Sequence, residues 1–309
     1  EAAATRAASG KALAAVAAVA DNLLGGSADL APSNNTYVKG RGDYSRTDRA
    51  GRNFHFGIRE HAMAAICNGM AYHGGLRPYC ATFLVFSDYL RPALRVSAIA
   101  KLPVVYVLTH DSIFVGEDGP THEPVEHLAA LRAIPNLRVL RPGDPEETNE
   151  AWRRACERTD GPTALILSRQ ALPTLRKHDS AWKTTFDRGA YVVRDCAGTP
   201  EIVVIAPGSE VQLDVAAATD LPGRKIRVGS MPGREDFLRQ DGTWRESLVP
   251  AAARKVVIEA ACDLGWAGPF DDSVDTVTIS SFGESGPADK LAEHFGFTKK
   301  AVAERLAAM

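Results

Sequence analysis

Apolar runs without polar alternation are the feature that most constrains how this 309-residue chain can fold. The clearest is PVVYVL at residues 103–108, and TALILS at 163–168 and EIVVIA at 201–206 are further expected strands. A strand that is apolar at every position is typical of a parallel sheet covered by helices on both faces. Stretches of helical length separate the strands, which predicts parallel pairing through right-handed crossovers. The expected fold class is α/β, with two doubly wound, mainly parallel sheets in tandem.

Three stretches outside these strands carry helix signals, which are a cap, a proline position and an apolar stripe. Ser9 and the glycine pair 25–26 frame residues 12–20, ALAAVAAVA, as a capped helix and not as a signal peptide or membrane span. Pro92 fits a helix over 89–100 only near its first turn. A helix within 56–75 is expected to bury an apolar stripe made of Ile58, Ala62, Ala65, Ile66 and Met70. Because residue 1 is not Met, we expect the chain to begin at a cut end.

A polar stretch without helix or strand period interrupts the alternation at residues 169–188. Such a break is typical of a domain boundary. After it the strand and helix signals resume in a second, shorter set. We therefore expect a first domain at residues 1–170, a linker at 171–188 and a second domain at 189–309.

Composition and charge argue against several classes of protein. Hydrophobic residues make up 45% of the chain and charged residues 24%, as in a globular protein with a substantial core. The formal net charge of -2 gives no field that would attract nucleic acid or an acidic membrane. The five cysteines are scattered without a CxxC pair, which favours a reducing compartment. We expect a cytoplasmic protein without nucleic-acid or membrane partners.

The richest candidate site directly follows the strand at 103–108. Residues 109–124, THDSIFVGEDGPTHEP, begin where that strand ends, and the carboxyl ends of strands form the ligand-binding rim of open α/β sheets. This loop contains His110, Asp118 and His122 among two histidines, three acids and two glycines. The alternative is that the acids cap a helix starting near Pro124 and the histidines are ordinary surface side chains.

A second candidate combines one acid with three aromatic rings. Glu60 stands at the beginning of a helix whose remainder is apolar or small, a setting that desolvates a carboxylate and raises its pKa. The alternative is a glutamate favoured at that end by the helix dipole. Phe83, Phe86 and Tyr89 recur every three residues and can enclose a flat heteroaromatic ligand, although core packing is the usual reason for such a stripe.

Anion and metal binding give opposite expectations. Arg6 precedes the first helix and Arg169 follows the strand at 163–168, where a guanidinium suits bidentate phosphate binding. Ser33 can add a hydrogen-bond donor to the same anion. Solvated surface arginines are common, so each arginine alone is weak evidence for an anion site.

HEPVEH at 122–127 does not have the histidine spacing of a zinc protease, because its histidines are five residues apart with Pro124 between them. We expect no metal site built from this chain.

Together these segments resemble the transketolase family of thiamine-diphosphate enzymes. The resemblance is strong over residues 4–170, and APGSEV fits the family's carboxyl-terminal domain less distinctively. It implies that residues 1–170 bind the pyrimidine ring of the cofactor and that 189–309 form the C-terminal domain. The matching stretches, in the family's order, are ATRAASG, GGSADLAPSNNT, FGIREHAM, ATFLVFSDY, THDSIFVGEDGPTHEP, NLRVLRPGD and ILSRQ.

The resemblance implies a role for each candidate residue. Glu60 would be the catalytic acid that hydrogen-bonds the aminopyrimidine ring, and His110 and His122 would be catalytic histidines facing the substrate. Asp118 would recognise the donor's hydroxyl stereochemistry. The cofactor pocket would contain Glu60, Phe83, Phe86, Tyr89 and Asp29. The grip on the sugar phosphate would come from Arg6, Ser33 and Arg169, with His110 nearby.

The implied activity is transfer of a two-carbon ketol unit from a ketose phosphate to an aldose phosphate, with thiamine diphosphate as the electron sink. In this family an N-terminal domain with a GDG motif binds the diphosphate and a divalent ion, Mg or Ca. No GDG occurs in this sequence. The family's site lies between two subunits, so we expect a homodimer that also needs the missing N-terminal domain, and a fragment that is inactive alone.

Other interpretations keep the fold and change the function. Deoxyxylulose phosphate synthase and the β subunit of 2-oxo-acid dehydrogenases share the fold and the glutamate, but GEDGPTHEP together with SRQ favours transketolase. A non-catalytic α/β module that only dimerises or regulates is the alternative from another class.

Overall fold

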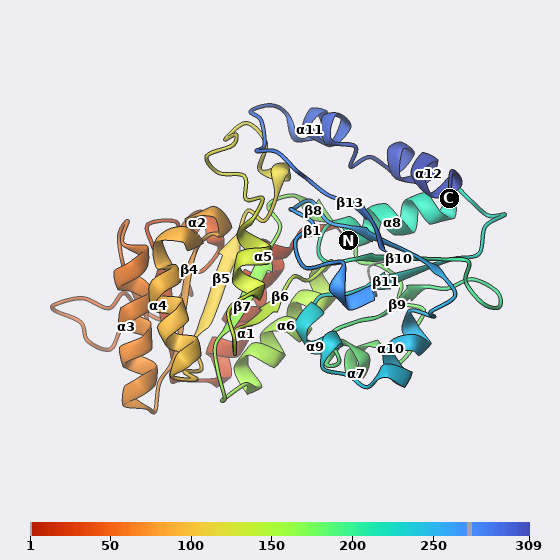
Figure 1. Ribbon diagram of the computed structural model, residues 1–309. Helices are drawn as coiled ribbons and strands as arrows, with labels where there is room; N and C mark the ends of the chain where they lie inside the picture. Colours follow the sequence, from red (N-terminus) through yellow and green to blue (C-terminus); the bar gives the residue numbers. More distant parts are fainter. Residues whose placement is uncertain (1, 271–273) are drawn as a thin grey trace.

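Two separate sheets dominate the computed structural model, which describes residues 2–270 and 274–309 (Figure 1). The first sheet has six strands in the order β3-β2-β4-β5-β7-β6, and every neighbouring pair is parallel. Its strands are β2 (Leu23–Ser27), β3 (Asn53–His55), β4 (Arg77–Phe83), β5 (Val105–Thr109), β6 (Arg138–Leu140) and β7 (Thr163–Leu167). The expected parallel α/β fold is confirmed, with β3 as a strand that the polar passage before Phe54 had concealed.

The directions of alternate side chains in β5 explain why the run before Thr109 has no polar position. Tyr106 and Leu108 pack into the core on one face of the sheet, whereas Val105 and Val107 pack into the core on the other. Helices cover both faces, so neither set meets water. The first face carries α3 (Glu60–His73), α4 (Ser87–Ile99) and α5 (His127–Arg132), and the second carries α1 (Thr5–Val19) and α6 (Pro145–Glu157).

The expected start of the first helix is wrong. α1 begins at Thr5, and Ser9 lies buried inside it, where its hydroxyl accepts a hydrogen bond from Trp152 Nε1 at 2.8 Å. The short strand β1 (Ala3–Ala4) pairs with β8 (Ala171–Leu172), and the Thr5 backbone N–H donates to Ser168 Oγ at 3.1 Å. These long-range contacts fix the start of the helix, so Ser9 is not its cap.

Two expectations for α3 and α4 are also wrong. α3 buries Met63, Ala64 and Cys67, while Ile66, placed in the buried stripe from sequence, is 47% exposed. Pro92 is the sixth residue of α4 because this helix begins at Ser87, directly after a 3-10 turn over Leu84–Phe86. The helical period located the apolar residues but did not show which set faces the sheet.

The second sheet has the order β13-β12-β10-β11-β9, in which only the pair β9 and β11 is antiparallel among the described strands. Its antiparallel edge β9 was not expected. α8 (Glu210–Thr219) and α12 (Lys299–Ala307) pack on one face, and α9 (Arg234–Leu238) and α10 (Gly242–Leu248) on the other. The strands are β9 (Tyr191–Arg194), β10 (Ile202–Ala206), β11 (Ile226–Ser230), β12 (Arg254–Ile258) and β13 (Val274–Val277).

The segment between the domains carries structure of its own. It contains β8 and α7 (Trp182–Phe186), and Trp182 packs against Tyr191 with ring centroids 5.6 Å apart. Among the residues that the structure describes, no helix is long and apolar enough to cross a bilayer.

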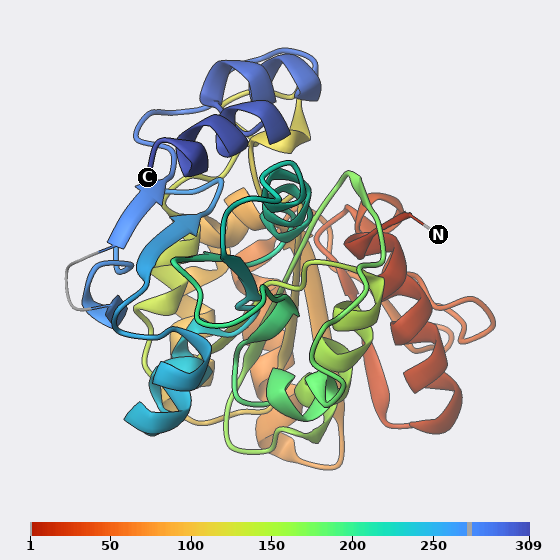
Figure 2. The same cartoon turned by 90° about the vertical axis from the view of Figure 1, so that its right-hand side faces the viewer.

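The loop at 109–124 lies against the second domain. Figures 1 and 2 both show it beside α11 (Ala288–Phe295). Ile113, in the short 3-10 turn of this loop, and Val125 belong to the hydrophobic core of the second domain. The Ser285 hydroxyl also donates to the Glu117 carbonyl at 2.6 Å. The second domain therefore helps to set the shape of this loop.

Candidate active site

A cavity of about 480 Å³ opens at the carboxyl end of β2, beside the start of α3. Glu60, Phe86 and Tyr89 line it together with Asp29. Phe86 and Tyr89 lie with ring centroids 6.1 Å apart, and Phe83 stacks on Phe86 at 5.8 Å. The three rings therefore form one row, of which Phe83 is the buried end outside the cavity lining.

Glu60 is the acid of this cavity. It is the first residue of α3 and is 8% exposed, and its carboxylate oxygens are not among the fully buried polar atoms that lack a partner in the described residues. The cavity wall around it is apolar, with Ala28, Leu30 and Ile58. A carboxylate that lines a cavity in this way keeps its oxygens open to accept hydrogen bonds from a ligand.

Asp29 connects this cavity to a neighbouring one of about 460 Å³, which Tyr37 and His55 also line. Its backbone is left-handed, with φ of 61°, and its side chain is exposed. Asp29 therefore stands at the rim that the two cavities share.

His110 continues the aromatic row from the end of β5. Its imidazole stacks on Phe83 with centroids 3.7 Å apart, and the residue is 4% exposed. Burial, followed in decreasing order by the charges of Arg6, Arg169 and His122, lowers the pKa of His110 to about 3. The ring is therefore neutral at physiological pH.

A hydrogen-bond chain fixes the tautomer of that neutral ring. The Thr109 hydroxyl donates to Asn34 Oδ1 at 2.7 Å and lies 2.8 Å from His110 Nδ1. Because its only hydrogen goes to Asn34, the hydroxyl accepts from Nδ1–H of His110. Nε2 is then left as an acceptor. Sequence analysis missed Asn34 and Thr109, although Asn34 lies in the matched stretch GGSADLAPSNNT.

The cationic candidates gather beside His110. Arg6 Nη1 donates to the Ser33 carbonyl at 2.6 Å, so two of the expected phosphate ligands are in contact. Burial lowers the pKa of Arg6, and the nearby Arg169 adds to the effect. Neither guanidinium forms an ion pair with a carboxylate in the described part of the chain. Two unneutralised cations close together suit an anionic ligand.

His122 and Asp118 come from the loop at 109–124. His122 meets Phe86 edge-on, with centroids 5.4 Å apart, and its Nδ1 lies 2.9 Å from the Thr121 hydroxyl. Asp118 is exposed, and no hydrogen bond or ion pair within the described residues joins it to the other candidates. The structure thus gathers His122 with the aromatic row but leaves Asp118 at the outside of the loop.

A group of possible metal ligands lies next to Tyr89. Nε2 of the buried His127 is 3.3 Å from an oxygen of Asp88, and Nδ1 is 3.7 Å from an oxygen of Glu126. One ligand atom from each of the three residues lies within 4.8 Å of the other two, but both carboxylates are exposed, and exposed acidic groups commonly cluster without an ion. We therefore assign no metal to this group.

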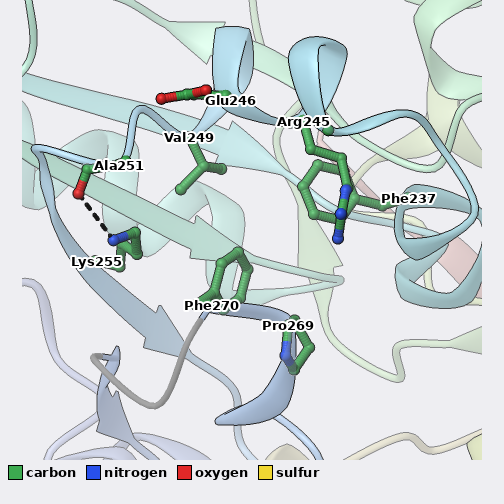
Figure 3. A pocket seen from close by; sticks show the side chains of 9 residues that line it. Phe237, Arg245, Glu246, Val249, Ala251, Lys255, Pro269 and Phe270 are labelled. Atoms are coloured by element: carbon green, nitrogen blue, oxygen red, sulfur yellow. Dashed lines mark hydrogen bonds between the residues drawn. The ribbon is translucent and has the colours of Figure 1, made fainter.

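A second hollow, of about 250 Å³, lies on the second domain between α10 and β12 (Figure 3). Phe237 and Phe270 contribute to its wall, and Lys255 Nζ donates to the Ala251 carbonyl at 3.1 Å. None of the residues predicted from the sequence lines it. It is separate from the candidate active site.

Glu123, next to His122, is a buried acid that sequence analysis did not single out. It is 2% exposed, and a Cβ on Gly283 of the second domain would lie 1.7 Å from its Oε2. Burial raises its pKa to about 7, and the backbone amides of Gly116 and Glu284 only partly offset this. The signal in the sequence was its place in GPTHEP, directly after the expected site residue His122.

We expect Glu123→Gln to stabilise the protein more at pH 8 than at pH 5. The folded pKa of about 7 exceeds the usual 4.5, so the folded state holds the proton more tightly than the unfolded state. The free energy of unfolding of the unsubstituted chain therefore falls as pH rises from 4.5 through 7, and Gln removes this loss. Urea unfolding of both chains at the two pH values measures the effect, with the exposed Glu117→Gln as control. An equal difference at both pH values would contradict the expectation.

Comparison with known proteins agrees with this geometry. Residues 1–174 match the family described as transketolase, pyrimidine binding domain, and residues 189–298 match the transketolase-like C-terminal domain. The fold and cavity therefore define a pyrimidine-binding domain followed by a C-terminal domain of this type. The chain belongs to the transketolase family.

Similar proteins extend over the whole chain. A transketolase of Halalkalibacterium halodurans is 49% identical over 309 residues, and one of Treponema pallidum is 51% identical over 302 residues. These alignments cover 99% and 97% of this chain but 46% and 45% of the relatives. The chain thus spans about half the length of the curated relatives it matches.

Solved structures give the same result. Transketolase from Leishmania mexicana superposes with a TM-score of 0.94 at 44% identity, covering 99% of this chain and 45% of that one. A transketolase of Pichia stipitis in complex with sedoheptulose-7-phosphate also gives 0.94, at 39% identity over 100% of this chain and 46% of the other. A split-gene transketolase, described as an inactive β4 tetramer, shares the fold at a TM-score of 0.76 and 23% identity over 97% of this chain and 96% of its own.

Proposed function

We propose that this chain supplies the pyrimidine-binding and C-terminal parts of a transketolase that moves a two-carbon ketol unit from a ketose phosphate to an aldose phosphate. One observation carries the proposal: the largely buried Glu60 lines the same cavity as Phe86 and Tyr89. That combination fits an aminopyrimidine, which needs one hydrogen-bonding acid and flat apolar walls. Transketolase relatives at about 50% identity support the substrate class.

The residues of the cavity fit thiamine diphosphate. When bound, this cofactor supplies an electron sink for cleavage of a C–C bond next to a carbonyl. Glu60 would hydrogen-bond a ring nitrogen and hold or release a proton there. Phe86 and Tyr89 would contact the pyrimidine ring, and Phe83 would stack on Phe86 and hold it in place. Asp29 would lie at the rim of the cavity. A divalent ion and the diphosphate would be held by a separate N-terminal domain.

The substrate groups would meet the polar side of the site. His110, neutral and with Nε2 free to accept, would orient a substrate hydroxyl, and His122 would face the same region from the loop. Arg6, Ser33 and Arg169 would hold the phosphate of the sugar. Asp118 would reach a donor hydroxyl only if the loop or the substrate brings them together, because it lies outside the cluster.

Partner chains complete this proposal. Helices α3 and α4 both carry exposed apolar side chains, with Ile66 47%, Val96 53% and Ile99 61% exposed, and we call their exposed sides the α3–α4 face. Ala62, Ala65 and Gly69 on α3 are also exposed and small, which allows another helix to approach closely. We assign this α3–α4 face to a second copy of the chain in a homodimer. The split-gene β4 tetramer supports the idea that a chain of this extent associates with other subunits.

The test is reconstitution with the diphosphate-binding part of a relative's transketolase, thiamine diphosphate and Mg²⁺. We expect ketol transfer from xylulose 5-phosphate to ribose 5-phosphate in the mixture and none with either polypeptide alone. Release of sedoheptulose 7-phosphate measures the reaction. Turnover of pyruvate in place of the ketose phosphate would reject the proposal in favour of a related thiamine-diphosphate enzyme.

A further inference from the structure

A buried ion network joins the candidate active site to the second domain at Arg141. This residue follows β6 and is fully buried. Its Nε donates to Asp111 Oδ2 at 3.0 Å, and its Nη1 donates to the carboxylate of Glu210 and lies 3.5 Å from an oxygen of Glu259. Asp111 is the residue after His110, whereas Glu210 begins α8 and Glu259 follows β12. One guanidinium thus connects the active-site loop to two acids of the second domain.

The second domain holds Arg141 rigidly. The Arg141 backbone N–H donates to the Pro232 carbonyl at 2.8 Å, and the Gly208 N–H donates to the Arg141 carbonyl at 2.9 Å. Gly208 has φ of 65°, and a Cβ there would lie 2.6 Å from Arg141 Nε. The second domain therefore presents a glycine where the guanidinium passes, together with backbone partners on both sides of the arginine.

Glu259 is fixed independently of Arg141. Arg132 grips it through two hydrogen bonds of 2.8 Å, and Trp266 Nε1 donates to it at 2.7 Å. All of these side chains are buried, so removing one partner leaves an uncompensated charge in a medium of low dielectric constant. Each of the three acids of the network thus contacts at least one of the two guanidiniums.

His110 is a residue that needs such support. Its φ of 61° lies in the left-handed region, which a side chain other than glycine rarely adopts. Strained residues of this kind persist only where the surroundings fix them on both sides. On one side Thr109 is tied to Asn34, and on the other Asp111 is tied to Arg141. The anchoring of Asp111 leads through Arg141 into the second domain.

We propose that the second domain acts as a positioning element for His110. Glu210 and Glu259 fix Arg141, Arg141 fixes Asp111, and Asp111 holds His110 in its left-handed conformation against Phe83. Arg141, Asp111 and Glu210 are positioning residues, because none of them faces the cavity. The consequence for substrate binding rests on the proposed function, whereas the placement of the ring does not.

The experiment measures the His110 ring in the full 309-residue chain without substrate. Two-bond ¹H–¹⁵N correlation spectra of histidine-labelled protein report the shifts of both ring nitrogens, and the spectrum of His110→Asn identifies the signals. We expect Glu210→Gln and Asp111→Asn to shift or broaden the His110 signals at pH 7.5. Both replacements keep the side-chain shape and remove one charge. Circular dichroism at the same temperature establishes that each variant is folded.

The matched control is Glu147→Gln. Glu147 is equally buried and also joins the domains, since it accepts from the Tyr191 hydroxyl at 2.5 Å and the Ser230 hydroxyl at 2.7 Å, but it does not touch Arg141. We expect the His110 signals of the Glu147→Gln variant to match those of the unsubstituted chain. Unchanged His110 signals in folded Glu210→Gln and Asp111→Asn, or an equal change in Glu147→Gln, would overturn the proposal.

Kinetics in the reconstituted enzyme give the second measurement. A histidine displaced by about 1 Å loses up to about 100-fold in rate, so kcat/KM for the sugar phosphates should fall in Glu210→Gln by roughly 10- to 100-fold. Glu147→Gln should stay within about 3-fold of the unsubstituted enzyme, as a substitution that affects no substrate-positioning group. If the unsubstituted enzyme fails to transfer ketol units, the proposed function is rejected. The ring spectra alone then test whether the second domain positions His110.

Discussion

Glu60→Gln in the reconstituted enzyme should lower kcat for ketol transfer by about 100- to 10,000-fold, the range of a lost proton-transfer group. Gln keeps the shape and one acceptor of the side chain but can neither take nor return a proton. The carboxylate that it replaces lines the cavity together with Phe86, and the residue is 8% exposed. Steady-state kinetics at saturating thiamine diphosphate measure the change, and calorimetric titration gives the affinity for the cofactor.

Glu146→Gln is the control for this substitution. Glu146 also lies in the first turn of a helix, α6, but it is exposed and far from the cavity, where it pairs with Lys177 at 2.6 Å. Its replacement should leave kcat within about 2-fold, because surface charge pairs contribute little. Turnover that survives Glu60→Gln unchanged would remove the catalytic assignment and favour a non-catalytic module.

The second large effect is expected at the α3–α4 face. Ile66→Asp combined with Ile99→Asp should weaken self-association by about 30-fold or more, since each places a charge where an apolar contact is lost at the centre of an interface. The exposed position of both residues means that the monomer itself should stay folded. Sedimentation velocity over a range of concentrations measures the shift from dimer to monomer.

Val19→Asp is the matched control for this prediction. Val19 is an exposed apolar residue at 87%, but it ends α1 on the opposite face of the first sheet. The same substitution there should leave the dimer intact. A dimer that tolerates both aspartates on α3 and α4, or dissociates equally with Val19→Asp, would show that the α3–α4 face is not the contact between copies.

The two domains contribute to the candidate site in different ways. The first supplies the acid, the rings and the arginines from the ends of its strands, as open α/β sheets do. Among its described residues the second domain contributes none to the lining of the Glu60 cavity, yet Ile113 of the loop at 109–124 and Val125 directly after it pack into its core. Its contribution to the site is therefore through the conformation of that loop.

Sequence patterns were sufficient where local chemistry decides the structure. The unbroken apolar run before Thr109 predicted a strand buried on both faces, and the structure has it in the middle of the first sheet. Sequence patterns were insufficient where the residues in contact lie far apart in the chain. Ser9 looked like a cap, and Ile66 looked like core, because the contacts of Thr5 with Ser168 and of α3 with α4 are invisible in a local window.

By itself, the sequence determined the strand and helix order, the α/β class and the short segments from which the family resemblance was drawn. Those features depend on residue type and spacing within about 20 positions. Only the tertiary structure decided that His110 is neutral and strained, that Arg6 and Arg169 stand beside it without an ion pair to any described carboxylate, and that Arg141 ties the loop to the second domain. Burial and charge proximity depend on distances in space between residues from different strands, and folding alone sets those distances.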